Sequence, residues 1–327
     1  MKPTRLILIA LVAIATIWGC KKDVVDNTPA PSPSPTPTSS EPMFRQYFAD
    51  NVADATQTFT VNAVTGGQVM GTRGTQLDFE PGAFIYDDGT PVTGQVQVSL
   101  VEVLSVSEMI LFNIQTVGND NGNLRMLRSG GAINVYANQG STPVQITNGG
   151  LIAKIPTDIG DPSMDLFSGN INSDGNMIWD RIDSAIVSVD SAYYDTRDYT
   201  YTFPYYFNYN FNPESNSNWN NCDFWWDYPT TTSVQATIPS TYTWYNTQTW
   251  IIFPTENASA GMYSNPSLIV TSPQVGVGAD AVVVSIYGDS LGVYSSFNPI
   301  TVAPGMNIPL SYTPTTIAQF EADVNAL

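Results

Sequence analysis

The sequence of 327 residues contains no histidine and only two cysteines. Without imidazole the chain has no Ser-His-Asp triad, no Cys-His pair and no histidine ligand for a metal ion, and it lacks the usual proton acceptor near neutral pH. Basic residues are also few, with 11 Lys and Arg against 29 Asp and Glu, which gives a net charge of −18. Binding of a nucleic acid or another polyanion needs a basic footprint, so this balance argues against such partners.

The first of the two cysteines, Cys20, ends an apolar run near the N-terminus. Lys2 and Arg5 precede this run, which covers residues 6–18. A run of this length is too short to cross a bilayer core, which takes about 20 apolar residues, but it suits the apolar part of a secretory signal peptide. We therefore expect residues 1–19 to be a signal peptide and Cys20 to begin the mature chain.

The stretch "LILIALVAIATIWGC" resembles the lipobox of bacterial lipoproteins, and "GCKKD" resembles lipoproteins of the Bacteroidota. The resemblance implies that Cys20 carries diacylglycerol on its thiol and an acyl chain such as palmitate on its amino group. Acyl chains anchor a protein because each buried methylene group contributes about 0.8 kcal/mol. The resemblance thus implies a lipid anchor in the outer membrane, with the cell surface and the periplasmic face both left open. We expect no cofactor besides this lipid.

Residues 20–55 are expected to hold the lipidated cysteine and a tether. Their stretch "NTPAPSPSPTPTSSEP" alternates proline with small residues, which prevents helix and sheet hydrogen bonding and favours polyproline II. At about 3.1 Å per residue, the stretch from Lys21 to Pro42 is expected to hold the folded part roughly 60 to 70 Å from the membrane. With Cys20 lipidated, Cys222 has no partner for an intrachain disulfide, and we expect it to be a small buried hydrophobic residue.

Most of the chain beyond the tether shows the period-two alternation of β-strands. In "GQVQVSLVEV", for example, Val96, Val98 and Leu100 fall on one face. Turn signals such as "DDGTP" and "NDNGN" separate the short strands, which is typical of antiparallel sandwiches or barrels. The last stretch, "TPTTIAQFEADVNAL", has the apolar stripe of a helix, with Phe320 and Val324 on it.

These patterns predict a mostly β protein with two antiparallel β-sandwich-like domains, an aromatic connector and a short C-terminal helix. The first β domain is expected over residues 56–160 and the second, with its helix, over residues 231–327. The aromatic and Asn-rich connector is expected between them, over residues 161–230.

Several motifs in this part of the chain resemble one known family. "GTRGTQLDFEPGAFIYDDGTPVTGQVQVSLVEVLSVSEMI", "LRSGGAINVYA" and "IPT" are similar to a β domain of Bacteroidota surface lipoproteins, whose opening resembles the ZU-type β-sandwich of ankyrins and netrin receptors. "MDLFSGNINSDGNMIWD", "NNCDFW" and "AQFEADVNAL" resemble the rest of that bacterial family, so the likeness covers most of residues 56–327. The family has no assigned activity. Some eukaryotic relatives of the ZU-type domain cleave themselves at a motif that contains histidine, and this activity does not carry over to a chain without histidine.

The segment from Tyr193 to Tyr228 is rich in aromatic residues, which fill 15 of its 36 positions and alternate with Asn and Asp. Aromatic rings beside amide and carboxylate groups suit a sugar site, because the sugar's C–H groups stack on the rings and the polar side chains bind its hydroxyls. The segment also fits a plug between two β-sandwiches, which is the favoured interpretation. The candidate ligand-binding residues are Tyr205, Tyr206, Tyr209, Trp219, Trp225 and Trp226.

The stretch "NINSDGN" places Asn and Asp at alternate positions, like the start of an EF-hand calcium loop. The glutamate that such a loop needs at its twelfth position is replaced by Arg181, and no flanking helices are expected, so the EF-hand interpretation fails. An irregular calcium site at Asp174 and Asp180 remains as an alternative. The pattern favours a plain Asp-Gly hairpin turn instead.

Two carboxylates at a suitable separation hydrolyse glycosides without histidine, and Asp223 and Asp227 are the pair that the aromatic segment offers. The sequence nevertheless favours a non-catalytic binding, adhesive or scaffold role at the cell envelope, with the membrane as a partner through the lipid. Glycans and other envelope proteins are the further partners to consider. The alternatives are a glycan-binding surface protein that uses residues 193–228 and a carboxylate-dependent glycosidase.

Overall fold

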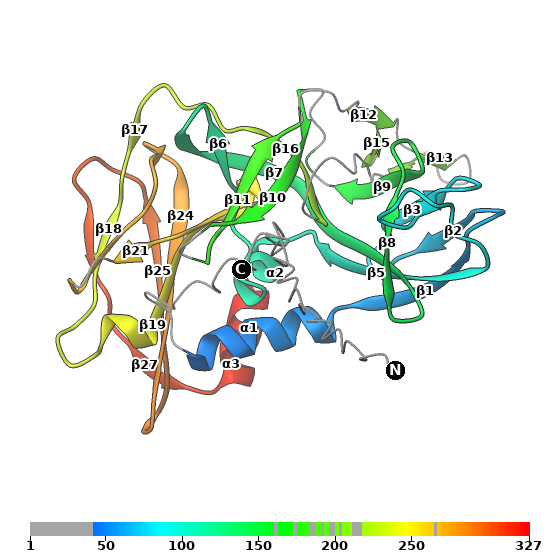
Figure 1. Cartoon of the computed structure of the whole chain (residues 1–327). Helices are drawn as coiled ribbons and strands as arrows, with labels where there is room; N and C mark the ends of the chain where they lie inside the picture. Colours follow the sequence, from blue (N-terminus) through cyan, green and yellow to red (C-terminus); the bar gives the residue numbers. More distant parts are fainter. Residues whose placement is uncertain are drawn as a thin grey trace, which may run out of the picture. The chain divides into compact units, whose positions relative to one another are not determined.

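The computed structural model of the chain describes residues 42–157, 159, 163–172, 175–182, 187–190, 193–195, 200–202, 205–210, 218–264 and 267–327, and for 42–43, 187–210 and 264 it describes the backbone alone. Cys20 and Asp174 lie outside the described residues. The described residues, from 42 onward, belong to one compact unit. As expected, this unit is mostly β, with several sheets and a short C-terminal helix (Figure 1).

The larger sheet of what we call the first β region contains nine of the described strands. Its central path runs in the order β1 (Gln57–Asn62), β5 (Gln95–Val103), β7 (Asn123–Gln139), β16 (Trp219–Trp225), β10 (Asp165–Ile171), β11 (Met177–Arg181) and β6 (Val117–Asp120), and β8 (Thr142–Ile146) joins β7 to β4 (Phe84–Ile85). All these pairings are antiparallel except that of β11 with β6.

The second sheet of the first β region has five described strands, in the order β12 (Val187–Asp190), β15 (Tyr205–Asn210), β9 (Leu151–Thr157), β3 (Gln76–Phe79) and β2 (Gly67–Met70). Strands β13 (Tyr193–Asp195) and β14 (Thr200–Thr202) pair with each other. Side chains from the nine-stranded and five-stranded sheets share one hydrophobic core, which contains Val96, Val98 and Leu100 from β5 and Ile155 from β9. The alternation that predicted β5 therefore did identify its buried face.

The second β region is built from two more sheets. One has the order β20 (Ala258–Gly261), β19 (Thr247–Phe253), β24 (Asp280–Asp289), β25 (Gly292–Thr301) and β27 (Thr313–Thr315), and the other has the order β21 (Tyr263–Ser264), β22 (Ile269–Thr271), β18 (Gln235–Thr237) and β26 (Asn307–Pro309). Strands β17 (Thr231–Thr232) and β23 (Val275–Gly276) form a separate pair, and η1 (Trp244–Asn246) and η2 (Pro254–Glu256) are short 3₁₀ turns on either side of β19. A second hydrophobic core joins these sheets.

Three α-helices in the described part of the chain come together although they are far apart in sequence: α1 (Pro42–Asp54), α2 (Val106–Leu111) and α3 (Ile317–Asn325). Phe44 of α1, Ile110 of α2 and Phe320 of α3 share a hydrophobic core with Trp250 of β19. Helix α2 begins with a capping box, in which the hydroxyl of Ser105 accepts from the third amide of the helix. Residues 42–54, which the sequence analysis assigned to the tether, are thus helical, and α1 is anchored by the apolar ring of Phe44.

The segment expected to connect two domains also differs from its description. Strands β10, β11 and β16 lie within the nine-stranded sheet, and β12 and β15 lie within the five-stranded sheet. Residues 161–230 therefore supply strands to both sheets of the first β region. The alternation in this segment was hard to read because several buried positions of β16 are polar, namely Asn220, Asn221 and Asp223.

Buried hydrogen bonds join the two β regions. The amide of Thr116 donates to the Ser259 carbonyl at 2.8 Å, and the amide of Ser259 donates to the Thr116 hydroxyl at 2.9 Å. Both residues are almost fully buried, with exposed fractions of 1% and 0%. Such paired bonds away from water resemble the ladder of a sheet and hold the two regions in a fixed register.

Gln115 extends this contact with all of its polar side-chain atoms. Its Oε1 accepts from the Gly261 amide at 2.9 Å and from the Tyr263 hydroxyl at 2.7 Å, while its Nε2 donates to the Met177 carbonyl at 2.8 Å. The backbone carbonyl of Gln115 accepts from the indole of Trp179 at 2.6 Å. One buried side chain thus bridges β11 of the first region and β20–β21 of the second.

Asn257 makes the third link, from the turn between η2 and β20. Its backbone is in the left-handed region with φ of 44°, a conformation that asparagine tolerates better than most residues. Its side-chain amide donates to the carbonyls of Ser129 at 2.8 Å and Leu104 at 3.2 Å. We call Gln115, Thr116, Ser129, Asn257 and Ser259 the seam.

Candidate functional site

The first candidate site is β16, which begins at Trp219 and ends at Trp225, with Trp226 directly after it. The half-buried ring of Trp225 meets the Phe167 ring edge-on at 5.4 Å, and the guanidinium of Arg125 lies 4.9 Å from its centroid. The ring also covers Gly118 so closely that a Cβ there would come within 2.8 Å of it. These neighbours occupy much of the ring surface that a sugar would need.

Arg125 is itself held in place by carboxylates. Its Nη1 donates to Asp120 and its Nη2 to Asp227, each at 2.5 Å. A guanidinium over an indole ring is a favourable cation–π contact, and the two carboxylates fix its orientation. Sequence reasoning missed Arg125, because it lies 100 positions before Trp225 and nothing in the local pattern relates the two.

Trp226 packs in the other direction. Its ring meets the Phe253 ring at 4.6 Å and the Tyr228 ring at 5.1 Å, both nearly edge-on, and it contributes to the hydrophobic core of the second β region. Trp225 and Trp219 contribute instead to a hydrophobic core of the first region. These three tryptophans therefore pack as the plug interpretation expects, with neighbouring residues in the cores of different regions.

The three candidate tyrosines lie on another sheet. Tyr205, Tyr206 and Tyr209 belong to β15, whose backbone pairs with β9 and β12, and their side chains lie outside the description. By the period of a strand, Tyr205 and Tyr209 share one face and Tyr206 lies on the other. The tyrosines and tryptophans are thus divided between two sheets, and sugar binding by the segment as a whole stays a prediction.

The candidate calcium residue Asp180 is engaged in hydrogen bonds. Its Oδ1 accepts from the Asn119 amide at 2.9 Å and its Oδ2 from the Asn170 amide at 3.1 Å. Within the described ranges, no three His, Cys, Asp or Glu side chains are grouped closely enough to hold a metal ion. Since Asp174 lies outside those ranges, the calcium site also stays a prediction.

The two candidate glycosidase carboxylates have opposite environments. Asp223 is fully buried, and its Oδ2 accepts from the Asn221 amide at 2.6 Å. Burial raises the pKa of the Asp223 carboxyl well above its ordinary value, which the nearby Ser129 hydroxyl and Gly130 amide offset only in part. The side chain of Asp227 is 84% exposed and paired with Arg125. A substrate that contacts Asp227 therefore does not contact Asp223, and the two do not face a common opening.

A β-bulge in β7 lies opposite the buried Asp223 of β16. Between the pairs Asn221–Ala132 and Asp223–Ser129, strand β7 contains one residue more than β16. Gly131 within this bulge has φ of 132°, and a Cβ at that position would come within 2.8 Å of a side-chain atom of Ile155. Cys222, between the two polar residues of β16, is fully buried as expected, and burial raises the pKa of its thiol.

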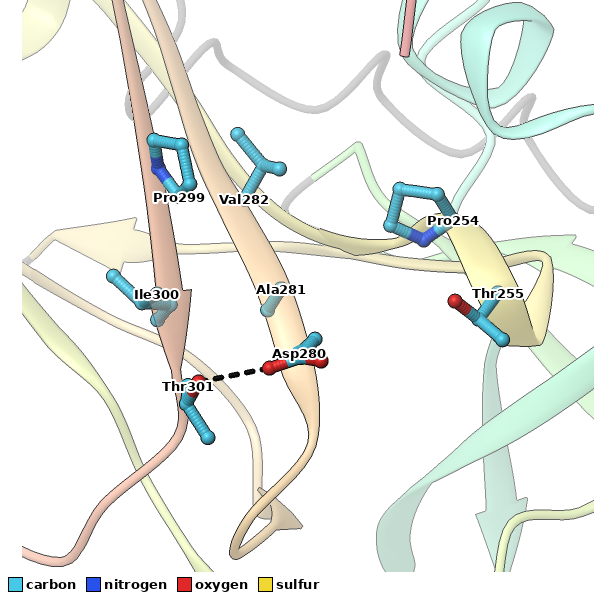
Figure 2. Close-up of a pocket in the computed structure, with 8 residues that line it drawn as sticks. All are labelled: Pro254, Thr255, Asp280, Ala281, Val282, Pro299, Ile300 and Thr301. Atoms are coloured by element: carbon cyan, nitrogen blue, oxygen red, sulfur yellow. Dashed lines mark hydrogen bonds between the residues drawn. The ribbon is translucent and has the colours of Figure 1, made fainter.

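An open groove with a volume of about 440 Å³ lies between η2 and the strands β24 and β25 (Figure 2). Ala281, Val282, Pro299, Ile300 and Pro254 give it an apolar lining. Asp280 is its single charged residue, and this carboxylate accepts from the Thr301 hydroxyl at 2.8 Å. The groove was not foreseen, because its walls combine two strands with a turn that precedes them by about 25 positions.

No family model matches the chain, and no curated protein or solved structure is significantly similar to it. In the described part of the chain, no helix has both the length and the apolar character needed to span a bilayer.

Proposed function

We propose that the chain is a lipid-anchored protein of the bacterial outer membrane whose folded part has a non-catalytic binding, adhesive or scaffold role. The lipid on Cys20 anchors the chain, and the proline-rich stretch separates the anchor from the folded residues. The observation that carries the proposal is the seam, because it makes the two β regions behave as one rigid support for the surfaces they expose.

The seam supports such a role for a physical reason. Contacts between independently moving domains are commonly small and more polar than a core, so relative motion is the default expectation. Here the contact is made by buried backbone and side-chain hydrogen bonds, such as those between Thr116 and Ser259. Separating the two regions would break these buried hydrogen bonds and leave their donors and acceptors to be paired by water. A rigid body suits a protein that presents fixed surfaces to partners.

The anchor is tested by metabolic labelling of cells with an alkyne-bearing palmitate analogue. The wild-type chain is expected to take up the label and to sediment with outer membranes, whereas Cys20→Ala is expected to remain unlabelled and to leave the membrane fraction. Cys222→Ala is the matched control, since the other cysteine is buried and should not alter labelling. Equal labelling of Cys20→Ala and wild type would overturn the proposed anchor.

The membrane face is tested with proteinase K added to intact cells, with a periplasmic lipoprotein as the protected control. Loss of the folded part would assign it to the cell surface, and protection would assign it to the periplasmic face. A purified chain that releases reducing sugar from a glycan, with the release abolished in Asp227→Asn, would contradict the non-catalytic role.

A further inference from the structure

The inner face of one sheet in the second β region changes along its strands from apolar residues to residues with hydroxyl groups. Ala281 and Val283 of β24 lie in the hydrophobic core, and the same face continues with Ser285 and Tyr287. Neighbouring β19 shows the same change, with Thr249 opposite Ser285. The hydroxyls of Thr249 and Ser285 are 2.7 Å apart, so the apolar interior gives way to a layer of hydroxyl groups at this end of the sheet.

Tyrosine rings cover this hydroxyl layer. Tyr242, which precedes η1, has ring centroids 4.7 Å from Tyr312, 4.8 Å from Tyr287 and 5.8 Å from Tyr294. Two of these neighbours have hydrogen-bond partners: the Tyr312 hydroxyl is 2.7 Å from that of Ser285, and the Tyr287 hydroxyl donates to Asp289 at 2.8 Å. The rings of Tyr287 and Tyr312 are thus held in place by hydrogen bonds where they contact the ring of Tyr242, and Tyr287 also contacts Tyr294.

Four aromatic residues reach the surface here, and we call Tyr242, Trp244, Tyr245 and Tyr294 the aromatic patch. The rings of Trp244 and Tyr245 meet edge-on at 5.9 Å, and Tyr245 is 45% exposed. The other three are half-buried. Among the described residues, none accepts a hydrogen bond from the indole N–H of Trp244 or from the hydroxyl of Tyr242, Tyr245 or Tyr294, so each ring that reaches the surface carries a free donor.

The free donors restrict what the aromatic patch can bind. A wholly apolar partner would cover the N–H and O–H groups without pairing them, which is unfavourable. A polyanion would meet a chain with a net charge of −18 and a patch without Lys or Arg. A neutral carbohydrate has C–H faces that stack on the rings and hydroxyl oxygens that accept from the donors.

We propose that the aromatic patch binds a neutral carbohydrate. This inference rests on the binding role proposed above, and it names the ligand class and the surface. It assigns the sugar to four aromatic residues of the second β region, whereas the sequence pointed to residues 193–228. The expected arrangement is stacking on Trp244 and Tyr245, with the hydroxyls of Tyr242 and Tyr294 donating to the sugar.

The test uses the full lipidated chain in detergent, titrated with neutral hexasaccharides of glucose (β-1,3 and β-1,4 linked), of mannose and of xylose. Tryptophan emission and titration calorimetry report binding. At least one sugar is expected to bind saturably, and Trp244→Ala and Tyr245→Ala are each expected to weaken that binding at least tenfold, as truncation of a central aromatic contact commonly does. Tyr136→Ala is the matched control, since this tyrosine is 37% exposed on β7 of the other region.

Absence of saturable binding to every hexasaccharide would overturn the inference. So would equal weakening in Tyr136→Ala and in the two patch variants, because binding would then not depend on the aromatic patch. Circular dichroism of each variant separates loss of binding from loss of fold. Palmitate labelling of Cys20 is independent of sugar binding, so failure of this inference is distinguishable from failure of the proposed anchor.

Discussion

Asp223→Asn is expected to stabilise the folded protein at neutral pH, by an amount that grows as the pH rises. Burial raises the pKa of this carboxyl well above its ordinary value of 3.8, so the folded chain retains a proton that the unfolded chain has released. The free energy of unfolding of the wild type therefore falls with rising pH, by about 1.4 kcal/mol per pH unit between 3.8 and the folded-state pKa. Asparagine has no proton to lose, and its oxygen keeps the position that accepts from Asn221.

The measurement is urea unfolding of the full chain at pH 5, 6 and 7, followed by tryptophan emission. The advantage of Asp223→Asn over wild type should widen by about 1.4 kcal/mol for each pH unit below the folded-state pKa. Asp227→Asn makes the same chemical change at a side chain that is 84% exposed, and its difference from wild type should not vary in this way. An advantage of Asp223→Asn that is the same at all three pH values would refute the reasoning.

Two further substitutions test the seam and the first helix. Asn257→Gly keeps the left-handed backbone but removes the two side-chain hydrogen bonds to the carbonyls of Ser129 and Leu104, so it should cost about 1 to 3 kcal/mol in urea unfolding; an unchanged midpoint would contradict the role given to the seam. Phe44→Ala removes a ring that is 1% exposed and should cost about 3 to 5 kcal/mol, whereas the exposed Arg45→Ala should change stability by less than about 0.5 kcal/mol. Equal, small effects of the last two would show that α1 contributes nothing to the fold.

The sequence predicted elements whose buried positions are apolar. Val96, Val98 and Leu100 alternate along β5, and all three are fully buried; Phe320 and Val324 mark the C-terminal helix, and both are fully buried. In such segments the spacing of the apolar residues matches the side chains that the fold buries, so the sequence pattern alone is sufficient to predict the element.

Elements whose buried positions are polar, or whose buried side chains pack on distant elements, were harder to predict from the sequence. Asn221 and Asp223 are buried in β16 because Asn221 bonds both Ser129 and Asp223 beside a bulge in β7, 90 positions earlier. Helix α1 follows directly after a proline-rich stretch, so the spacing of the buried Phe44 and Phe48, four positions apart, was its main signal. Both cases depend on distant partners, which no local window contains.

The candidate sites were predictable to a similar degree. The density of aromatic residues located the end of β16, but not the stacking of Arg125 on Trp225, which depends on the pairing of two sheet strands. The aromatic patch was missed because "TYTW" is short, and because Tyr294 and Tyr312 reach Tyr242 only through the folding of β25 and the loop before β27.

The packing of α1 against α3 also sets the order in which the folded unit can be completed. The Tyr47 hydroxyl donates to Glu321 at 3.0 Å, across 274 positions of sequence. Contacts between residues so far apart in sequence form late, because the intervening chain must fold before such contacts stabilise the structure. Helix α1 therefore lacks the part of its hydrophobic core that α3 supplies until the C-terminal helix has been made. A chain cut short before Ile317 would keep the contact between the Phe48 and Trp250 rings but would lack Phe320 and Val324, so unfinished chains expose apolar surface of this core that finished chains cover.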